Sequence, residues 1–396
     1  MIVVAVASGT SVDALDVGLV DLSWEDGGGV AVQVLDTWQE EWPQGLASRL
    51  LALLPPAMTT AAELCALDTE VGRAVAKVAV SAAARTRRLT GEGPSLVVSP
   101  GQTVHHEVVD GRCLGTLQLG QPAFVAEQSG LPVISDLRAR DVAAGGHGAP
   151  LASTLDQLWL AGEMPTAALN LGGIANVTVV RHGTDPLAWD TGPANCLLDV
   201  AATRATGGAL RFDAEGALAA EGAIHGELLE RLLSHPHFRL TPPVSTGRET
   251  FSAAWLDDVL AAVGGIPWVD VLATLTELTA RTVADGLRPH AVTEVVVSGG
   301  GAANPTLMKF LQRNLGDVRL VTSDERGIPA AGKEVVLWAL LGFLSWYGVP
   351  GTTGATGARG ARILGRLSPG DRPLHLPPSV SEYPSHLRVL TRKVAR

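Results

Sequence analysis

The chain has 396 residues, of which 46% are hydrophobic and 18% charged, and its formal net charge is -10. This balance excludes a disordered chain and is typical of a globular protein long enough for two well-filled domains. The negative charge argues against general nucleic-acid binding, because such binding needs clustered Lys and Arg.

The cysteines and the apolar segments bear on the compartment. Cys65, Cys113 and Cys196 are odd in number and widely spaced, so they form neither a disulfide framework nor a metal-ligand pattern. The longest uncharged apolar run, Val335–Val349, is too short to span a bilayer and predicts a buried helix. The N-terminus has no signal-peptide pattern, so we expect a cytoplasmic protein that does not bind membranes.

The predicted elements begin with a β-hairpin. An apolar strand starts at Ile2, and after the turn SGTSVDALD a second, alternating strand runs to Leu22. A turn that only reverses the chain more often uses two residues such as Asn-Gly. The glycine, hydroxyls and backbone N–H groups of this turn suit an anion, and we expect it to hold phosphate.

Strands and helices alternate through the next part of the chain. We expect strands over Val30–Thr37, Leu96–Ser99 and Val133–Ser135, helices over Ala61–Leu89 and Pro122–Ser129, and a glycine-rich polar loop over Arg138–Pro150. Two carboxylates and two guanidiniums crowd into residues 135–141. They are either surface ion pairs or ligand contacts, since the small residues that follow permit close approach.

A second hairpin has the same design as the first. Strands Ala167–Asn170 and Asn176–Val180 flank the turn LGGIA, which suggests a duplicated architecture, although two glycine turns can also resemble one another by chance. Further strands at Leu187–Trp189 and Glu294–Val297 and helices from about Ala194, around Glu215–Leu233, Val269–Leu287 and Thr306–Leu315 follow. This alternation predicts mixed-sheet α/β layers.

Two more glycine-rich turns follow apolar strands. In DTGPAN, Pro193 suits the first turn of a helix whose free N–H groups would attract phosphate, and Asp190 places a carboxylate at the strand tip. Asp190 can alternatively serve only as a helix cap. In SGGGAAN, Gly299 to Gly301 let a flat ligand or phosphate approach the backbone, and the partial dinucleotide fingerprint fails at Asn304.

One further glycine motif is a decoy. Residues Gly327 to Lys333 match the first seven positions of a P-loop, but Glu334 replaces the Ser or Thr that binds Mg²⁺. A carboxylate there would repel phosphate, so we predict no P-loop. Glu334 is either a first-turn residue favoured by the helix dipole or a substrate ligand.

Taken together and in order, these motifs resemble the anhydro-N-acetylmuramic acid kinases of the sugar kinase, Hsp70 and actin superfamily. The resemblance runs from SGTSVDALD through GQTVHH, LGQPAFVAE, SDLRARDVAAGGHGAPL, LNLGGIANVTV, WDTGPANCLLD, STGRETF and SGGGAANPTLM to the glycine-rich stretch before Ile363. It implies an α/β, two-domain sugar kinase/Hsp70/actin-like fold with mixed β-sheets flanked by helices and an interdomain cleft. The implied domains are residues 1–133, on which a tail from about 372 to 396 packs back, and residues 134–371.

The resemblance also implies the reaction. Such kinases use ATP and Mg²⁺ to open the 1,6-anhydro bridge of anhydro-N-acetylmuramic acid with water and phosphorylate O6, giving N-acetylmuramate 6-phosphate and ADP in cell-wall recycling. A homodimer is implied, and no residue is assigned as a metal ligand. Two departures from the family pattern, Pro100 and His147, bear on sugar selectivity.

The site residues are carried over position by position. Asp190 is the implied base that takes a proton from water. ATP binding is implied for Gly9, Thr10, Ser11, Val12, Asp13, Ala14, Leu15, Asp16, Gly172, Gly173, Thr191, Gly192, Asn195, Gly299, Gly300, Gly301 and Asn304. Sugar binding is implied for Gln102, Thr103, Arg138, Asp141 and Glu334.

Two other functions remain open from the sequence. A kinase of the same fold acting on a different sugar would use Asp190 to deprotonate a sugar hydroxyl instead of water. An ATP-gated interaction module would hydrolyse ATP slowly and ignore the anhydro sugar, but no separate peptide-binding domain follows the nucleotide-binding region.

Overall fold

The computed structural model describes residues 1–9, 11–54 and 57–391. Two compact units divide the chain: Met1–Trp159 together with the chain from Gly332 onward, and Leu160–Ala331. These limits differ from the expected domains, 1–133 and 134–371. The difference arises because helix α12 (Lys333–Trp346) packs on strands of the first unit, and β7 (Val133–Ser135) is part of its sheet.

The first unit is built on a seven-stranded mixed sheet of order β13-β7-β4-β1-β2-β3-β14. Strands β1 to β3 form an antiparallel meander, while β4 and β7 add in parallel to β1. The C-terminal segment supplies both edges, since β13 pairs with β7 and β14 pairs with β3. The other strands are β1 (Ile2–Ala7), β2 (Leu15–Trp24), β3 (Val30–Glu40), β4 (Leu96–Ser99), β13 (Arg366–Ser368) and β14 (Leu387–Val389).

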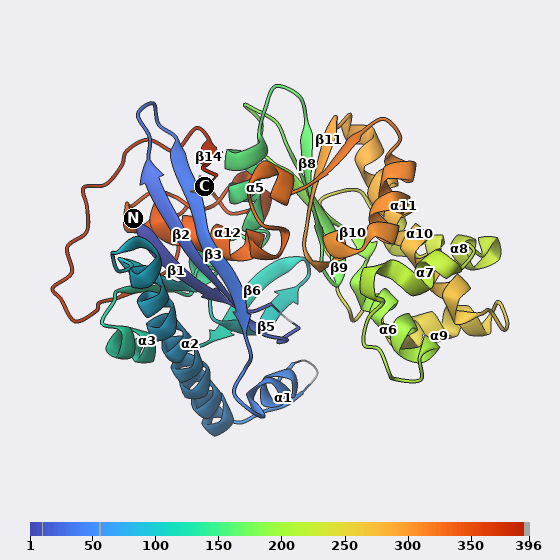
Figure 1. Ribbon diagram of the computed structural model, residues 1–396, viewed down its shortest axis with the longest axis horizontal. Coiled ribbons are helices and arrows are strands. Elements are labelled where there is room, and N and C mark those ends of the chain that lie inside the picture. The colour runs from blue at the N-terminus through green and yellow to red at the C-terminus, as the bar shows by residue number, and fades with distance from the viewer. Residues whose placement is uncertain (10, 55–56, 392–396) are drawn as a thin grey trace. The chain divides into compact units, whose positions relative to one another are not determined.

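Helices cover both faces of this sheet. Val4 and Val17 pack with the long helix α2 (Ala61–Thr90), which Figure 1 shows lying along the sheet. On the other face a Cβ at Gly18 would lie 2.6 Å from Val335 of α12, so the glycine permits the close approach of that helix. The remaining elements are α1 (Leu46–Leu51), α3 (Pro122–Ser129), α4 (Ala139–Ala143), α5 (Ala152–Leu160) and the separate two-stranded sheet of β5 (Gln102–Val109) and β6 (Arg112–Leu119).

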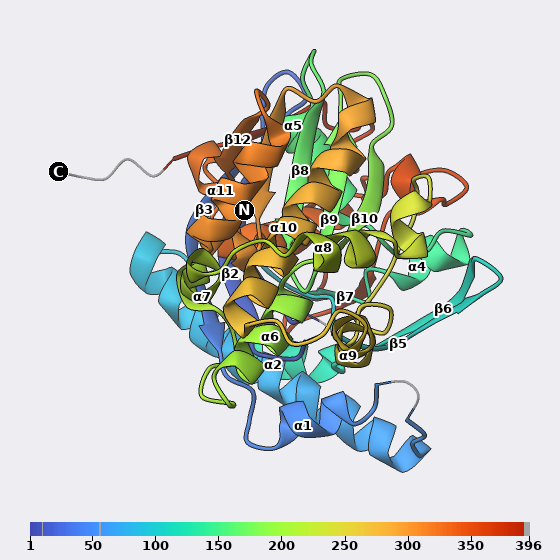
Figure 2. The ribbon, with the colours of Figure 1, turned by 90° about the vertical axis from the view of Figure 1, so that its right-hand side faces the viewer.

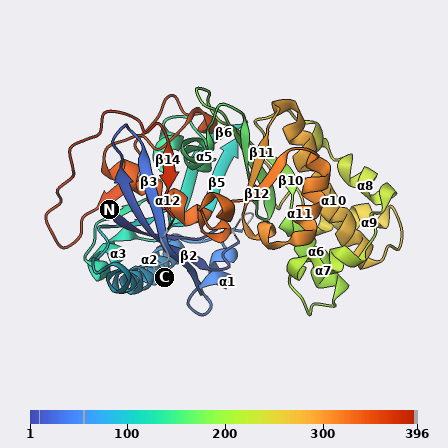
Figure 3. The same cartoon turned by 45° about the horizontal axis from the view of Figure 1, so that its top comes forward.

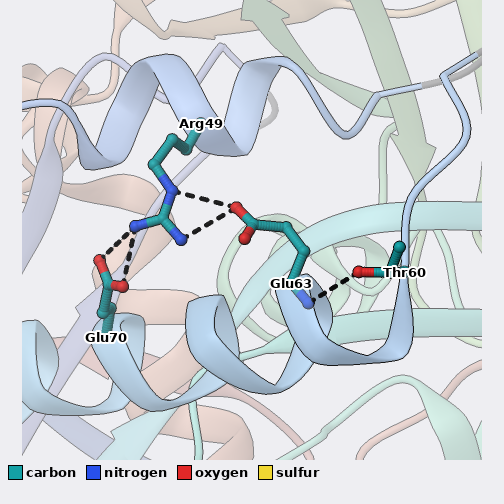
Figure 4. A network of polar contacts seen from close by, with 4 residues as sticks. All are labelled: Arg49, Thr60, Glu63 and Glu70. Atoms are coloured by element: carbon teal, nitrogen blue, oxygen red, sulfur yellow. Dashed lines mark hydrogen bonds and ion pairs between the residues drawn. The ribbon is translucent and has the colours of Figure 1, made fainter.

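A polar network ties α1 to α2 (Figure 4). Arg49 of α1 donates to Glu63 Oε1 at 2.9 Å and to Glu70 Oε2 at 2.7 Å, one carboxylate on either side of the guanidinium. Thr60 caps α2 by accepting from the Glu63 amide at 3.1 Å. The cap and the ion pairs together fix the start of α2.

The second unit repeats the strand order of the first. Its five-stranded sheet runs β10-β9-β8-β11-β12, again an antiparallel meander followed by two parallel strands. The duplicated architecture suggested by the two glycine hairpins is therefore confirmed. The strands are β8 (Thr166–Leu171), β9 (Ile174–Val180), β10 (Leu187–Pro193), β11 (Glu294–Ser298) and β12 (Arg319–Thr322).

Helices α10 (Trp268–Leu287) and α11 (Pro305–Leu315) pack side by side on one face of this sheet (Figure 2). Four shorter helices pack around the N-terminal half of α10, as Figure 3 shows. They are α6 (Asn195–Ala205), α7 (Ala217–Glu221), α8 (Gly226–Leu233) and α9 (Ala253–Ala261). They enclose a second apolar core with Phe251 and Leu272 at its centre.

The expected α/β class, with mixed sheets flanked by helices, is confirmed. Strand Leu96–Ser99 and helix Pro122–Ser129 have the expected bounds, and the apolar run at Val335–Val349 is the buried α12. The β5–β6 hairpin and strand β12 were not expected. Every helix in the described part of the chain is too short or too polar to span a bilayer.

Candidate active site

Asp190 lies at an irregularity in an edge strand. The register of the β10–β9 pairing shifts between Asp190 and Gly192. This shift is a β-bulge, and it leaves Thr191 without a paired residue in β9. Bulges change the direction of a side chain at a sheet edge and are frequent beside functional sites. A Cβ at Gly192, whose φ is +143°, would lie 2.7 Å from Phe238, so the bulge requires glycine here.

One distant segment holds Asp190 by three of its four polar atoms. The Asp190 amide donates to Val244 O at 2.9 Å, and Asp190 O lies 3.0 Å from His237 Nε2. The Thr246 amide donates to Asp190 Oδ2 at 2.8 Å. Asp190 is therefore not a helix cap: the N-cap of α6 is Ala194, which makes no side-chain cap, and the Asp190 carboxylate accepts from the Thr246 amide instead.

The surroundings of this carboxylate weaken its acidity. Burial, followed by the negative charge of Glu249, raises the pKa of Asp190 to about 6, and the hydrogen bond from Thr246 opposes the rise. A carboxylate with a pKa near neutrality can both take and return a proton in the physiological range. Asp190 also borders a cavity of about 380 Å³, together with Trp189, His237 and His290.

The start of α6 does not offer the free N–H groups expected for phosphate. The amides of Ala194 and Cys196 donate to Gly173 O at 3.0 and 3.1 Å, and the Asn195 amide donates to Gly172 O at 3.1 Å. The second glycine turn, LGGIA, thus occupies these donors with its own carbonyl groups. Pro193 ends β10 and is not in the helix.

The third glycine turn borders a separate cavity within the second unit. Gly299 and Gly301 pack against β8, since a Cβ at Gly299 would lie 2.6 Å from Asn170 Oδ1 and one at Gly301 would lie 2.6 Å from Leu171 Cβ. Gly300 is exposed, so a ligand can approach its backbone. A cavity of about 280 Å³ lies here, lined by Asn195, Leu198, Asp199, Phe212, Asp213, Glu215, Gly300, Gly301, Ala303 and Asn304.

This cavity brings together four of the residues expected to bind ATP, namely Asn195, Gly300, Gly301 and Asn304. Sequence reasoning missed Phe212, whose largely exposed ring (60%) offers a flat apolar face. Asn304 also has a local task, because it caps α11 by accepting from the Leu307 amide at 2.9 Å. That cap explains why the dinucleotide fingerprint has no glycine at this position.

In the first unit, the opening turn is held by its own backbone and by Gln102. The Val12 amide donates to Gly9 O at 3.1 Å, and Gln102 Nε2 donates to the same oxygen at 3.2 Å. The side chains of Val12 and Leu15 are buried in the core, so only their backbone can meet a ligand. Thr10 lies outside the described residues.

The carboxylates of this turn differ in exposure. Asp13 is exposed, whereas Asp16 is half-buried and accepts from Gln39 Nε2 at 2.8 Å. Burial, together with the charge of Asp13, raises the pKa of Asp16. No three His, Cys, Asp or Glu side chains in the described ranges gather as a metal site.

Two of the residues implied in sugar binding, Arg138 and Glu334, contact Trp338. The Arg138 guanidinium lies 5.1 Å from the centre of the Trp338 ring, and Trp338 Nε1 donates to Glu334 Oε1 at 3.3 Å. The surrounding protein raises the pKa of Glu334, as does the charge of Asp16, although the side chain remains accessible to water. Burial lowers the pKa of Arg138, and the charge of Glu334 opposes this.

Asp141 and Thr103 are occupied by contacts within the protein. Asp141 is fully buried and accepts from the Gly148 amide and from Thr356 Oγ1, both at 2.7 Å. Thr103 Oγ1 accepts from Gln118 Nε2 at 3.2 Å. Asp141 therefore shapes the loop that Arg138 also holds through Gly148 O, at 2.7 Å.

Glycine turns follow strands of both sheets, and Asp190, a carboxylate of raised pKa, lies in β10, which is typical of α/β proteins that bind ligands at the ends of their strands. The family model described as anhydro-N-acetylmuramic acid kinase matches residues 1–370. The chain belongs to the anhydro-N-acetylmuramic acid kinase family.

Individual relatives agree with the family match. An anhydro-N-acetylmuramic acid kinase from Streptomyces avermitilis is 49% identical over 98% of this chain and 99% of its own length. One from Rhodococcus erythropolis is 46% identical over 98% of this chain and 99% of its own length. A ROK hexokinase structure from Thermus thermophilus covers 87% of this chain and 99% of its own at a TM-score of 0.34 and 16% identity, too distant a likeness to carry an argument.

Proposed function

We propose that this protein is an ATP-dependent kinase that opens the 1,6-anhydro bridge of anhydro-N-acetylmuramic acid with water and phosphorylates O6. The products are N-acetylmuramate 6-phosphate and ADP. Membership of the family across residues 1–370 supports the reaction. The observation that carries it in the structure is Asp190, a carboxylate of raised pKa held by three of its polar atoms. The implied setting is cytoplasmic cell-wall recycling, by a homodimer.

The substrate determines the chemistry that Asp190 must perform. An anhydro sugar has no free 6-hydroxyl, so transfer of the γ-phosphoryl group to O6 must accompany cleavage of the C1–O6 bond. Water attacks C1, and Asp190 takes the proton that the water loses. Positioned general-base catalysis typically contributes about 10²–10⁴-fold.

ATP is assigned to the glycine turns. The cavity beside Gly300 and Phe212 suits the base and ribose of the nucleotide, and the opening turn at Gly9 to Asp16 suits its phosphates. Mg²⁺ enters as part of the Mg·ATP substrate. Phosphoryl transfer then depends mainly on alignment and on stabilisation of the phosphate charge.

The sugar is assigned to the side chains around Trp338. Arg138 offers a guanidinium for a carboxylate such as that of the lactyl group, and Glu334 offers an acceptor for sugar hydroxyls. Asp141 supports Arg138 through the shared loop at Gly148. Pro100 and His147 bear on which amino sugars are accepted.

Isotope labelling tests the proposed reaction directly. The enzyme is incubated with ATP and anhydro-N-acetylmuramic acid in ¹⁸O-water, and the product is analysed by mass spectrometry after a short reaction. We expect one ¹⁸O in the product, at C1. A phosphorylated product without label would show that the enzyme acts on a free hydroxyl instead, and the proposal would be wrong.

The labelling needs a control because a reducing sugar exchanges its anomeric oxygen with water. Unlabelled N-acetylmuramate 6-phosphate is kept in ¹⁸O-water for the same time without enzyme. Label acquired there is subtracted from the result. A parallel reaction with the N-acetylglucosamine analogue of the anhydro sugar measures the selectivity for the lactyl group.

The pH dependence should report the acidity of Asp190. The base must be deprotonated to accept a proton, so kcat/KM falls as the pH drops through about 6, the pKa of Asp190. The charge of Glu249 contributes to the raised pKa, so Glu249→Gln should move this acidic limb to lower pH. The measurement is kcat/KM for the anhydro sugar between pH 5 and 8.

Glu230→Gln is the matched control, because Glu230 is an exposed carboxylate on α8 of the same unit. It should leave the acidic limb where it is in the unchanged enzyme. If kcat/KM of the unchanged enzyme fell only near pH 4, or if Glu249→Gln did not shift the pH of this fall, Asp190 would not be the titrating base.

A further inference from the structure

Gln102 fixes the opening turn from inside the first unit. Its side chain is 1% exposed, and Nε2 donates to Gly9 O at 3.2 Å and to Thr103 O at 3.1 Å. Both partners are carbonyl oxygens, so the side-chain amide must present its nitrogen on this side. The amide oxygen, Oε1, consequently faces the opposite way.

Two buried polar atoms of opposite kind lie along one small cavity. Gln102 Oε1 and Trp42 Nε1 are both buried, and neither has a hydrogen-bond partner among the residues that the structure describes. Both side chains are more than nine-tenths buried, and both line the same cavity of about 10 Å³. Gln102 Oε1 can only accept a hydrogen bond, and Trp42 Nε1 can only donate one.

The cavity matches a single water molecule in size and in polarity. A volume of roughly 10–15 Å³ on this measure is what one buried water needs, along with at least two polar partners. Apolar side chains such as Val6, Val71 and Val75 form much of the remaining wall. A buried donor and a buried acceptor without partners are costly, and one water satisfies both.

We propose that one water molecule binds in this cavity, accepts a hydrogen bond from Trp42 Nε1 and donates one to Gln102 Oε1. Trp42 is thereby a positioning residue: through the water it holds the Gln102 amide, and through that amide it holds Gly9 O. The effect on ATP rests on the proposed function, in which this turn holds the phosphates. The presence of the water in the cavity does not depend on the proposed function.

The orientation of the amide is the step that couples Trp42 to the turn. If Oε1 were not held, rotation of the Gln102 amide would place Oε1 against the carbonyl oxygens of Gly9 and Thr103, where like partial charges repel. Gly9 O would then keep the Val12 amide and the longer bond from Ser8 Oγ, at 3.4 Å. The water selects the orientation that leaves Nε2 on the turn.

A crystal structure of the unchanged protein at about 1.5 Å resolution tests the water directly. We expect an ordered density peak within hydrogen-bond distance of both Trp42 Nε1 and Gln102 Oε1. A cavity without density, or one in which the two side chains contact each other directly, would overturn the proposal. This outcome is independent of what the protein catalyses.

Trp42→Phe tests the positioning role, because it removes the N–H and keeps an aromatic ring. The measurement is the affinity for the Mg²⁺ complex of a non-hydrolysable ATP analogue by titration calorimetry, without sugar. The loss of one net hydrogen bond predicts about three- to tenfold weaker binding. Wild-type affinity in Trp42→Phe would overturn the positioning role.

Trp24→Phe is the matched control. Trp24 Nε1 is also buried without a hydrogen-bond partner among the described residues, but its ring packs on Phe343 and Tyr347 and does not line this cavity. The same chemical change there should leave the affinity for the analogue unchanged. If the unchanged protein bound no ATP analogue, the proposed function would fail, and the crystal structure would still decide on the water.

Discussion

Asp190→Asn is expected to abolish sugar phosphorylation and leave ATP binding intact. The amide cannot accept the proton from water, so kcat should fall by about 10²–10⁴-fold, the usual contribution of a positioned general base. The fold should survive, since an Asn side-chain oxygen can still accept from the Thr246 amide that now bonds Asp190 Oδ2. The measurements are initial rates with ATP and anhydro-N-acetylmuramic acid, and the affinity for a non-hydrolysable ATP analogue.

Asp185→Asn makes the same change at an exposed carboxylate shortly before β10 and should behave as the unchanged enzyme. Near-normal turnover in Asp190→Asn would remove Asp190 as the base. A variant that lost ATP-analogue binding as well as turnover would indicate a local structural defect, which the thermal unfolding temperature would reveal.

The sequence predicted the identity of the strand-end turns because their signals are local. A pattern of glycines and hydroxyl side chains after an apolar strand lies within about ten residues of sequence. The strand order of both sheets agrees with the two hairpins that these patterns predicted. The β5–β6 hairpin was missed because the solvent-facing strands contain few apolar residues in clean alternation. Strand β12 was missed because it has four residues and pairs only in parallel with β11.

The surroundings of Asp190 could not be predicted, since they come from residues about fifty positions further along the chain. Spacing alone left open whether Asp190 caps α6, and the bond from Thr246 decides against the cap. For the same reason the amides at the start of α6 were expected to be free. Their partners are Gly172 and Gly173, whose carbonyl positions depend on the tertiary structure of the β8–β9 turn.

Lys333→Ala is expected to destabilise the fold strongly and to have little effect on ATP affinity. Although Lys333 stands at the lysine position of a P-loop, its ammonium lies 2.6 Å from Asp156 Oδ1, with side-chain exposures of 11% and 2%. Removing one partner of a buried ion pair leaves the other charge uncompensated, which costs about 3–5 kcal/mol. Urea or thermal unfolding measures the loss of stability, and titration with an ATP analogue at low temperature measures the affinity.

The paired variant Lys333→Met with Asp156→Leu separates stability from binding. It removes both charges and keeps apolar bulk, so most of the lost stability should return, as is common when a buried ion pair is replaced as a whole. If Lys333 bound phosphate, its removal would weaken ATP-analogue binding in both variants, regardless of their stability. Because Asp156 already neutralises Lys333, we expect unchanged affinity in both, and a loss of tenfold or more would reinstate the P-loop.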